Sequence, residues 1–211
     1  MIRLEIYQET AHFRIPTVGN PYLSYPLPPP STVYGFLRHI TNKESINFEN
    51  TELSIQGIYK SVSFEKEQLF LETKKGLKTN IVPIQKLHQC NWIIHIKSPS
   101  PLEGNILKAL ENFSGVLRLG RQEDLIIDIK INRDLEEKPL DIEDDFEERL
   151  YIYKRWEINE DADGSLFSMA LDTVVDENLK IIGYKPVNLI YSNVRRIKPK
   201  LYDGKYVVQW L

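Results

Sequence analysis

Cysteine is almost absent from the sequence, and no segment is apolar over a long stretch. Cys90 is the one cysteine among 211 residues, so the chain can form no internal disulfide and offers no cysteine cluster for a metal. No apolar run reaches the length that crosses a bilayer, and residues 1–10 lack the apolar region of a signal peptide. We therefore expect a cytoplasmic protein with no membrane contact.

Sequence motifs of the common enzyme classes are missing as well. There is no P-loop, no HExxH, no GxSxG and no paired Cys/His spacing. Among the histidines, His95 lies in an apolar stretch and is expected to be structural, whereas His39 is expected on a helix surface. His12 is the one in a loop that could carry chemistry. We predict no metal, no cofactor and no catalytic residue.

Acidic charge is concentrated in one segment. The net charge is −3, but residues 134–148 contain nine acidic side chains and one lysine, which leaves +5 for the remainder. Such a run is typical of a solvated linker, and here it also marks a boundary. The remaining surface can therefore carry a basic patch, which binding to a phosphate backbone requires.

The chain is organised around residues 24–37, SYPLPPPSTVYGFL, in which a proline-rich arm at residues 21–30 leads into a predicted helix. Three consecutive prolines stiffen the arm, and Ser31 and Thr32 follow as predicted helix caps. Val33, Phe36, Leu37 and Ile40 then recur at helical spacing. Two interpretations remain open: a helix N-terminus that binds an anion, or a tight loop-to-helix connection under a packed sheet.

Apolar patterning predicts an α+β fold. Strands are expected at 2–7, 52–64, 69–72, 92–97 and 125–131, with helices from 31 and over 102–113. This order is that of a ferredoxin-like (RRM-like) βαββαβ domain, assigned to residues 1–133. Residues 134–148 are the predicted acidic linker, and residues 149–211 are predicted to form a C-terminal β-rich subdomain with a small antiparallel sheet.

Two further segments carry clustered cations. A protruding β-hairpin over about residues 73–86 would carry Lys74, Lys75, Lys78 and Lys86; a solvated mobile loop is the equally weighted alternative. The segment 115–121, GVLRLGR, holds two glycines and two arginines, Arg118 and Arg121, and suits a phosphate-contacting loop. Its alternative is an ordinary helix-to-strand turn.

Three motifs together resemble Cas protein family five, the RAMP-type subunit of type I CRISPR Cascade. They are AHFRIP at 11–16, SYPLPPPSTVYGFL at 24–37 and GVLRLGRQEDL at 115–125. The likeness covers residues 1–131, and the sequences of the three motifs are most similar to those of the type I-B branch. It implies an RRM-like domain with a hairpin thumb that binds and caps the 5′ handle of the crRNA and anchors the foot of the backbone filament in antiviral defence. It also implies contacts with the backbone subunit and the large subunit, and with target DNA indirectly.

The predicted RNA-binding residues come from the residue patterns and from the family resemblance together. They are His12, Phe13, Arg14, Tyr25, Ser31, Thr32, Arg38, Lys74, Lys75, Lys78, Lys86, Arg118 and Arg121. Phe13 and Tyr25 are expected to stack on bases, and the cations to contact phosphates. Two alternatives stay open: a metal-independent endoribonuclease that uses His12, Tyr25 and a lysine, and a scaffold whose basic residues contact only protein.

Overall fold

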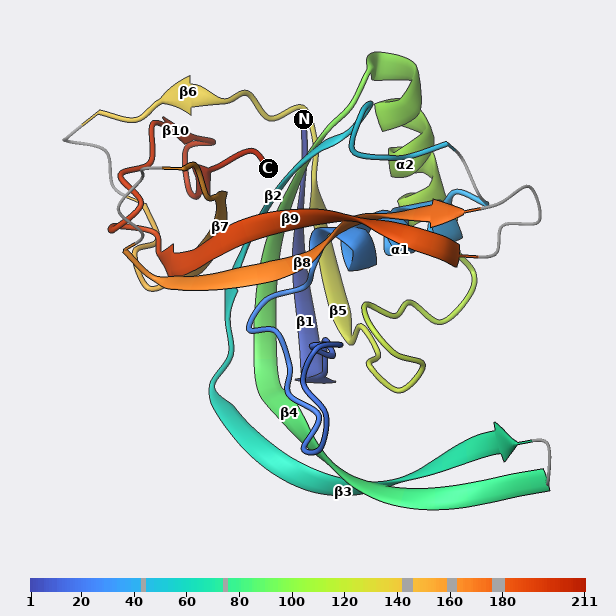
Figure 1. The fold of residues 1–211 in the computed structure, drawn as a ribbon. Helices are drawn as coiled ribbons and strands as arrows, with labels where there is room; N and C mark the ends of the chain where they lie inside the picture. Colours follow the sequence, from blue (N-terminus) through green and yellow to red (C-terminus); the bar gives the residue numbers. More distant parts are fainter. Residues whose placement is uncertain (43–44, 74–75, 142–145, 159–162, 176–180) are drawn as a thin grey trace.

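The computed structural model describes residues 1–42, 45–73, 76–141, 146–158, 163–175 and 181–211 (Figure 1). The strands are β1 Ile2–Ala11, β2 Glu52–Ile58, β3 Ser61–Thr73, β4 Gly76–Lys97, β5 Asp128–Asn132, β6 Lys138–Pro139, β7 Tyr151–Arg155, β8 Ser165–Val175, β9 Ile181–Asn193, β10 Leu201–Tyr202 and β11 Val207–Val208, and the helices are α1 Pro30–Ile40 and α2 Ser100–Asn112. The predicted mixed α/β composition is confirmed.

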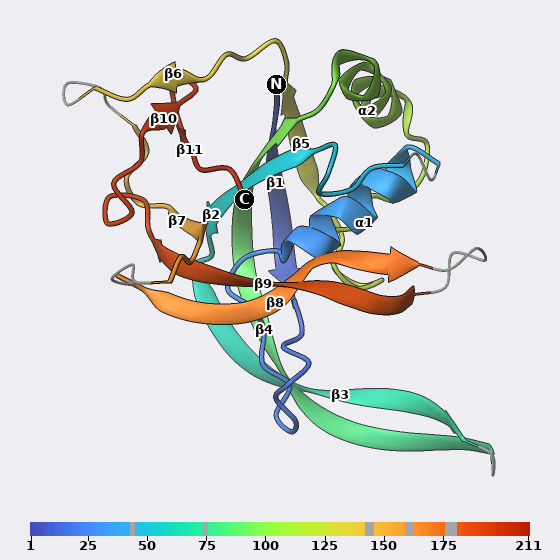
Figure 2. The same cartoon turned by 45° about the horizontal axis from the view of Figure 1, so that its top comes forward.

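One large sheet organises these elements. Its strand order is β5-β1-β4-β2-β7-β9-β8, with β3 paired to the outer part of β4, and a second sheet has the order β11-β10-β6. The pairings between these strands are all antiparallel. The two helices lie next to each other on one side of the sheet (Figure 2). No helix in the described ranges is long and apolar enough to cross a membrane.

Helix α1 buries the apolar face that its sequence predicts, since Val33, Phe36 and Leu37 are almost fully shielded. Its start differs from the prediction. The helix begins at Pro30, Pro29 occupies the N-cap position, and no side chain caps it. Proline suits the first helical position because its φ is already helical and it lacks the N–H that would stay unpaired there. Ser31 and Thr32 therefore lie within the first turn, and the predicted capping role is wrong.

Strand β4 belongs to two structures at once. Its inner part lies between β1 and β2, where Trp92 faces Ile6 and Gly57. Gly57 is required there, because a Cβ atom would lie 2.5 Å from Trp92 Cε3. The outer part pairs with β3 from Ser61↔His88 to Thr73↔Gly76, and this hairpin projects away from the rest of the molecule (Figure 1). The hairpin therefore begins at Ser61 and ends at His88, which is longer than the predicted range 73–86.

The C-terminal strands do not form the predicted separate sheet. Strand β7 pairs with β2 through Gln56↔Ile152 and Gly57↔Tyr151, so β7, β9 and β8 extend the main sheet. The small sheet that does form combines β10 and β11 with β6, which lies inside the predicted acidic linker. Part of that linker, residues 142–145, lies outside the described residues. Pairing across so many residues of sequence leaves no local pattern, which is why the prediction separated the two parts.

The buried polar groups include the histidine that was predicted to be structural. His95 is fully buried, and its Nε2 lies 2.9 Å from Asp203 Oδ2. Arg3 also donates to that carboxylate, and the backbone N–H of Tyr206 donates to its other oxygen at 2.8 Å. This cluster joins β1 and β4 to the segment between β10 and β11. The structural role predicted for His95 is thus confirmed.

Candidate nucleic-acid interface

Three segments that lie far apart in the sequence meet around one hollow, which we call the α1 cleft. It has a volume of about 460 Å³ and is lined by residues 12–14, by the exposed side of α1 and by residues 118–122. The predicted site residues on its wall are His12, Phe13, Arg14, Thr32, Arg118 and Arg121. The motifs that carried the family resemblance therefore converge in space.

An adjoining hollow extends the α1 cleft along the start of the helix. This second hollow, of about 610 Å³, shares Phe13, Arg14 and Thr32 with the first and adds Tyr25 and Ser31. Its far wall comes from β8 and β9. The two hollows adjoin at these three shared residues beside α1, and we refer to both together as the depression.

The loop that carries Arg118 and Arg121 is held by Asp124. The fully buried Asp124 carboxylate accepts from the Arg121 backbone N–H at 2.9 Å. Gln8 fastens the same loop from β1, donating to Leu119 O at 3.1 Å and to Asp124 O at 2.8 Å. Gly120 has φ +118, and a Cβ atom there would lie 2.8 Å from Asp124 Oδ2. The loop is therefore a fixed structure.

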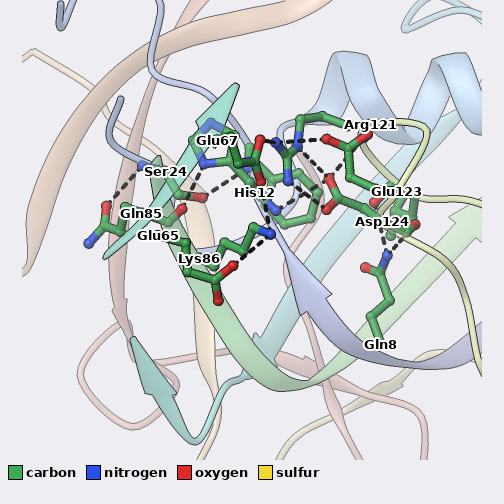
Figure 3. A network of polar contacts seen from close by, with 12 residues as sticks. Gln8, His12, Ser24, Glu65, Glu67, Gln85, Lys86, Arg121, Glu123 and Asp124 are labelled. Atoms are coloured by element: carbon green, nitrogen blue, oxygen red, sulfur yellow. Dashed lines mark hydrogen bonds and ion pairs between the residues drawn. The ribbon is translucent and has the colours of Figure 1, made fainter. Parts of the chain in front are cut away.

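Arg121 is paired with three carboxylates, so it is not a free cation, and its role as a phosphate ligand stays a prediction. It contacts Glu67 at 2.8 Å, Glu123 at 2.9 Å and Asp124 at 3.2 Å (Figure 3). Burial by itself would raise the pKa of Glu67, but hydrogen bonds from Lys86 and Arg121 hold that pKa below its ordinary value. The ion pairs thus join the loop to the base of the β3–β4 hairpin.

Lys86 is likewise engaged within the protein. Its Nζ lies 2.9 Å from Glu65 and 2.8 Å from Glu67 (Figure 3). Burial opposes the charged form, but the hydrogen bonds that Lys86 donates to both glutamates leave its pKa raised. Lys86 fastens the two arms of the hairpin and is not a free cation, and its contact with RNA stays a prediction. The glutamates lie two and four residues along β3 from its paired residue Ser63, so this contact could not be seen without the register.

The side chain of His12 is buried at the floor of the α1 cleft. Its Nδ1 lies 2.7 Å from the Gln85 carbonyl oxygen, and a carbonyl can only accept, so Nδ1 carries the proton. Nε2 is then an acceptor, and it has no hydrogen-bond partner among the described residues. Burial lowers the pKa of His12, which favours the neutral imidazole. One unpaired acceptor therefore lies buried beneath the cleft floor.

The proline arm clamps the hairpin against the cleft. Tyr22 N–H donates to Pro83 O and Gln85 N–H donates to Tyr22 O, both at 2.9 Å. The Ser24 N–H donates to Gln85 Oε1 at 2.9 Å. Arg14 lies over the Tyr22 ring, 3.7 Å from its centre. The arm thus positions the Arg14 guanidinium and fixes the outer part of β4.

Phe13 and Tyr25 are core residues, which corrects the prediction that they stack on bases. Each is 3% exposed. Phe13 packs edge-on against Trp92 with ring centres 5.8 Å apart, and Tyr25 packs edge-on against Phe167 at 5.7 Å. The Tyr25 hydroxyl donates to Ser168 O at 2.9 Å. Both rings support the wall of the depression from beneath and offer no free face.

Arg38 fastens α1 to β8, and this corrects its predicted contact with RNA. Its guanidinium holds both carboxylate oxygens of Asp172, at 2.7 and 2.8 Å. It also donates to Ile46 O at 2.6 Å and to Thr173 Oγ1 at 3.0 Å. Asp172 is 134 residues away in sequence, so no local pattern indicated this partner.

The remaining predicted cations divide into two groups. Lys74 and Lys75 lie outside the described residues, and only the backbone of Lys78, within β4, is described. Arg14 and Arg118 are exposed on the cleft wall, and neither forms an ion pair with a carboxylate in the described ranges. These two arginines are the cations that the α1 cleft offers to a ligand.

Sequence reasoning missed two polar residues of the cleft, His39 and Gln122, both exposed on its wall. Gly35 follows Thr32 by three residues, and His39 follows Gly35 by four. This spacing places all three on one helix face. That spacing was the signal that could have found it. Within the described ranges, no group of three or more His, Cys, Asp or Glu residues is arranged to hold a metal ion.

Comparison with known proteins gives a likeness of fold. No family model matches the chain, and no curated protein matches it. A solved structure described as a CRISPR RNA-guided surveillance complex contains a similar chain, with a TM-score of 0.59 and 9% identity over 91% of this chain and 89% of that one. A second, described as the crystal structure of a Cas protein, gives a TM-score of 0.52 and 13% identity over 98% and 97%. The chain has the fold of these proteins.

Proposed function

We propose that this protein is a subunit of a CRISPR surveillance complex, of the kind found in Cas protein family five, and that it binds the 5′ handle of the crRNA in the α1 cleft. The sequence motifs favour the type I-B branch. In this role the protein caps the foot of the backbone filament and touches the backbone subunit and the large subunit. It would touch target DNA only indirectly.

The order of the strands supports an RRM-like domain. The strands β5-β1-β4-β2 are neighbours in the sheet, and α1 follows β1 while α2 follows β4. If the hairpin is counted as an extension of the β2–β4 connection, this is the βαββαβ arrangement. The β3–β4 hairpin would then serve as the thumb. Its base is tied to the α1 cleft by the ion pair between Glu67 and Arg121.

The observation that carries the proposal is the meeting of the three motifs at the α1 cleft. Two exposed arginines, Arg14 and Arg118, line it without a carboxylate partner in the described ranges. Guanidinium groups bind phosphates through paired hydrogen bonds, so these side chains would hold the RNA backbone. The unpaired Nε2 of His12 would accept a hydrogen bond from a ribose hydroxyl or a base N–H.

Base stacking would involve different aromatic residues from those that the sequence indicated. Tyr184 is 61% exposed and lines the hollow that adjoins the α1 cleft. A base could stack on it, because every base has a flat aromatic face. Ser31 and Thr32 border the same depression and remain proposed RNA contacts.

The endoribonuclease alternative has weaker support. His12 is neutral and presents an acceptor, as a general base must. The Tyr25 hydroxyl, however, already donates to Ser168 O, and burial raises the pKa of Tyr25. Lys86 is engaged by two glutamates. The predicted tyrosine is therefore committed to a structural contact, and so is Lys86, which the prediction did not name as the lysine.

A single experiment separates these functions. The purified protein is incubated with labelled repeat RNA in EDTA, and the products are resolved on native and denaturing gels in parallel. Handle binding predicts a mobility shift with intact RNA, which weakens when Arg14→Ala and Arg118→Ala are combined. A discrete cleavage product that disappears in His12→Gln would instead support the endoribonuclease. RNA that neither shifts nor is cut would contradict both.

A further inference from the structure

A second polar cleft lies where β8 begins and β9 ends, at the opposite end of these two strands from the pair Val175↔Ile181. It has a volume of about 630 Å³ and is formed by the start of β7, the start of β8, the end of β9 and residues 195–196. It shares no lining residue with the α1 cleft or with the hollow beside it. We call it the β7–β9 cleft.

The β7–β9 cleft is rich in arginine. Arg149, Arg195 and Arg196 line it, and among the described lining residues Glu148 is the one carboxylate. Arg195 pairs with Glu148, and Arg196 pairs with Asp163 at 3.1 Å. Arg149 is exposed and forms no ion pair with a carboxylate in the described ranges. The walls therefore carry excess positive charge, with at least one guanidinium available to an anion.

An aromatic stack forms one side of the same cleft. Tyr151 and Tyr191 lie nearly parallel, with ring centres 4.9 Å apart and planes 16° apart. Tyr191 covers one side of the Tyr151 ring, and Tyr151 is 37% exposed. A planar ligand group can therefore continue the stack. Stacking on tyrosine beside arginine is the arrangement with which proteins hold single-stranded nucleic acid.

Ser192 contributes to the cleft beside this stack, and its side chain is 3% exposed. Successive side chains of a strand point to opposite faces, so Ser192 lies with its pair Ile152 on the face opposite Tyr191. The groups that the cleft offers to a ligand are therefore the tyrosine stack and the arginines.

The walls of the cleft are held in place. The Asn193 side chain donates to Glu148 O at 3.0 Å and to Leu150 O at 3.1 Å, and its oxygen accepts from the Arg195 backbone N–H at 3.0 Å. Asn193 thus fixes the segments on both sides. Gly164 lies at the edge of the cleft with φ +154, and a Cβ atom at this position would collide with Tyr191 O. A formed cleft loses little entropy when it binds a ligand.

From these observations we propose that the β7–β9 cleft is a second binding site for single-stranded nucleic acid. A base stacks on Tyr151, and the adjacent phosphate is held by Arg149. An acidic peptide would satisfy the arginines but would leave the tyrosine stack without a planar partner, so nucleic acid fits better. RNA and DNA share this chemistry, and the experiment tests both.

The test measures how many short oligonucleotides one protein molecule binds. RNA and DNA oligomers of about six nucleotides are titrated, and the stoichiometry is measured by sedimentation. We compare the wild type, Arg149→Ala/Tyr151→Ala for the β7–β9 cleft, and Arg14→Ala/Arg118→Ala for the α1 cleft. Arg133→Ala, an exposed arginine that pairs with Glu111 on α2, is the matched control. The wild type and the control should bind two oligomers, and each double variant should bind one.

Photo-crosslinking on the wild-type protein gives a readout that needs no variant. Oligomers that contain 5-iodouracil should crosslink to a peptide that includes Tyr151. Arg149→Ala alone should lower the slope of log affinity against log salt by about 0.7 at this site, and Tyr151→Ala should weaken binding there at least about fivefold. DNA-only or RNA-only binding at the site would identify its natural strand.

Several outcomes would overturn the inference. One is an unchanged stoichiometry in Arg149→Ala/Tyr151→Ala, and another is a crosslink map without Tyr151. Displacement of the oligomer by polyglutamate with no crosslink at Tyr151 would assign the cleft to an acidic peptide instead. If Arg14→Ala/Arg118→Ala retains both oligomers while Arg149→Ala/Tyr151→Ala loses one, the function proposed for the α1 cleft fails and this inference stands.

Discussion

Arg121 Nη1 lies 2.8 Å from Glu67 Oε2, and this contact joins the loop after α2 to the base of the β3–β4 hairpin. Both side chains are about four-fifths buried, at 23% and 20% exposure. Glu67 also holds Lys86 of the opposite arm. The hairpin and the α1 cleft are therefore parts of one charged network, and their positions are coupled.

A double-mutant cycle should detect this coupling. We expect Arg121→Ala to lower the free energy of unfolding by about 2 kcal/mol, because Asp124 and Glu67 lose charged hydrogen bonds. Glu67→Ala should cost less once Arg121 is absent, with an interaction energy of at least about 0.5 kcal/mol. Urea unfolding measures both values. Strictly additive losses would contradict the coupling.

Salt dependence of RNA binding should distinguish free from paired arginines. Arg14→Ala and Arg118→Ala should each lower the slope of log affinity against log salt by about 0.7, the value for one phosphate contact with a single strand. Arg38→Ala should leave that slope unchanged in the fraction that is folded, because Arg38 is held by Asp172. Equal slopes for Arg14→Ala, Arg118→Ala and the wild type would contradict phosphate binding in the α1 cleft.

The pair Arg38–Asp172 should matter for stability. Asp172 is 3% exposed, and its carboxylate is held by two guanidinium hydrogen bonds. Arg38→Ala leaves this charge buried without its partner, so we expect a loss of about 3 kcal/mol in the free energy of unfolding. Urea denaturation measures it. Adding Asp172→Asn should recover part of the loss, and an absence of recovery would contradict the ion-pair explanation.

Replacing Gly57 and Gly35 by alanine should change the stability of the protein in opposite directions. At Gly57 the new Cβ would lie 2.5 Å from Asn91 O and from Trp92 Cε3, so we expect a loss of about 1–3 kcal/mol in stability. At Gly35, within α1, the Cβ would meet no atom within 4 Å. There, alanine should stabilise the protein by about 1 kcal/mol through helix propensity. Thermal unfolding of both variants checks the pair, and a stable Gly57→Ala would contradict the close strand contact.

Stability should fall as the solution becomes mildly acidic. Burial lowers the pKa of His12 and of His95 in the native state. In the unfolded chain both side chains titrate at about pH 6.5. Below about pH 6.5 the unfolded state takes up protons that the native state excludes, so the stability present above this pH is lost. Urea midpoints across this range measure the effect. His12→Gln should reduce the dependence, and a midpoint that rises on acidification would contradict it.

Local patterns predicted those features that depend on neighbours in sequence. The spacing of Val33, Phe36 and Leu37 identified the buried face of α1, and the motif segments identified the residues of the α1 cleft. Which cations were free could not be predicted in this way. Arg38 finds its partner at Asp172, and that pairing depends on how β8 passes over the helix.

The sequence also predicted too short a hairpin and too few strands in the main sheet. The outer hairpin strands contain a polar stretch at 65–68 that resembles a loop, because neither face of the hairpin must be fully apolar when it projects from the core. The join between β2 and β7 depends on Gln56↔Ile152 and Gly57↔Tyr151 alone. So short a pairing leaves no alternation that a sequence pattern could indicate.

Strand β4 extends from Lys97 in the core to Gly76, which pairs with Thr73 at the far end of the hairpin. The distance from the α1 cleft to this last pair is therefore set by the number of residues in each arm. Removing two residues from each arm would shorten that distance by about 7 Å while the remaining side chains kept their faces. Removing one from each arm would move the distal side chains to the opposite faces. Any ligand that spans the cleft and the far end of the hairpin would thus be selected by its length.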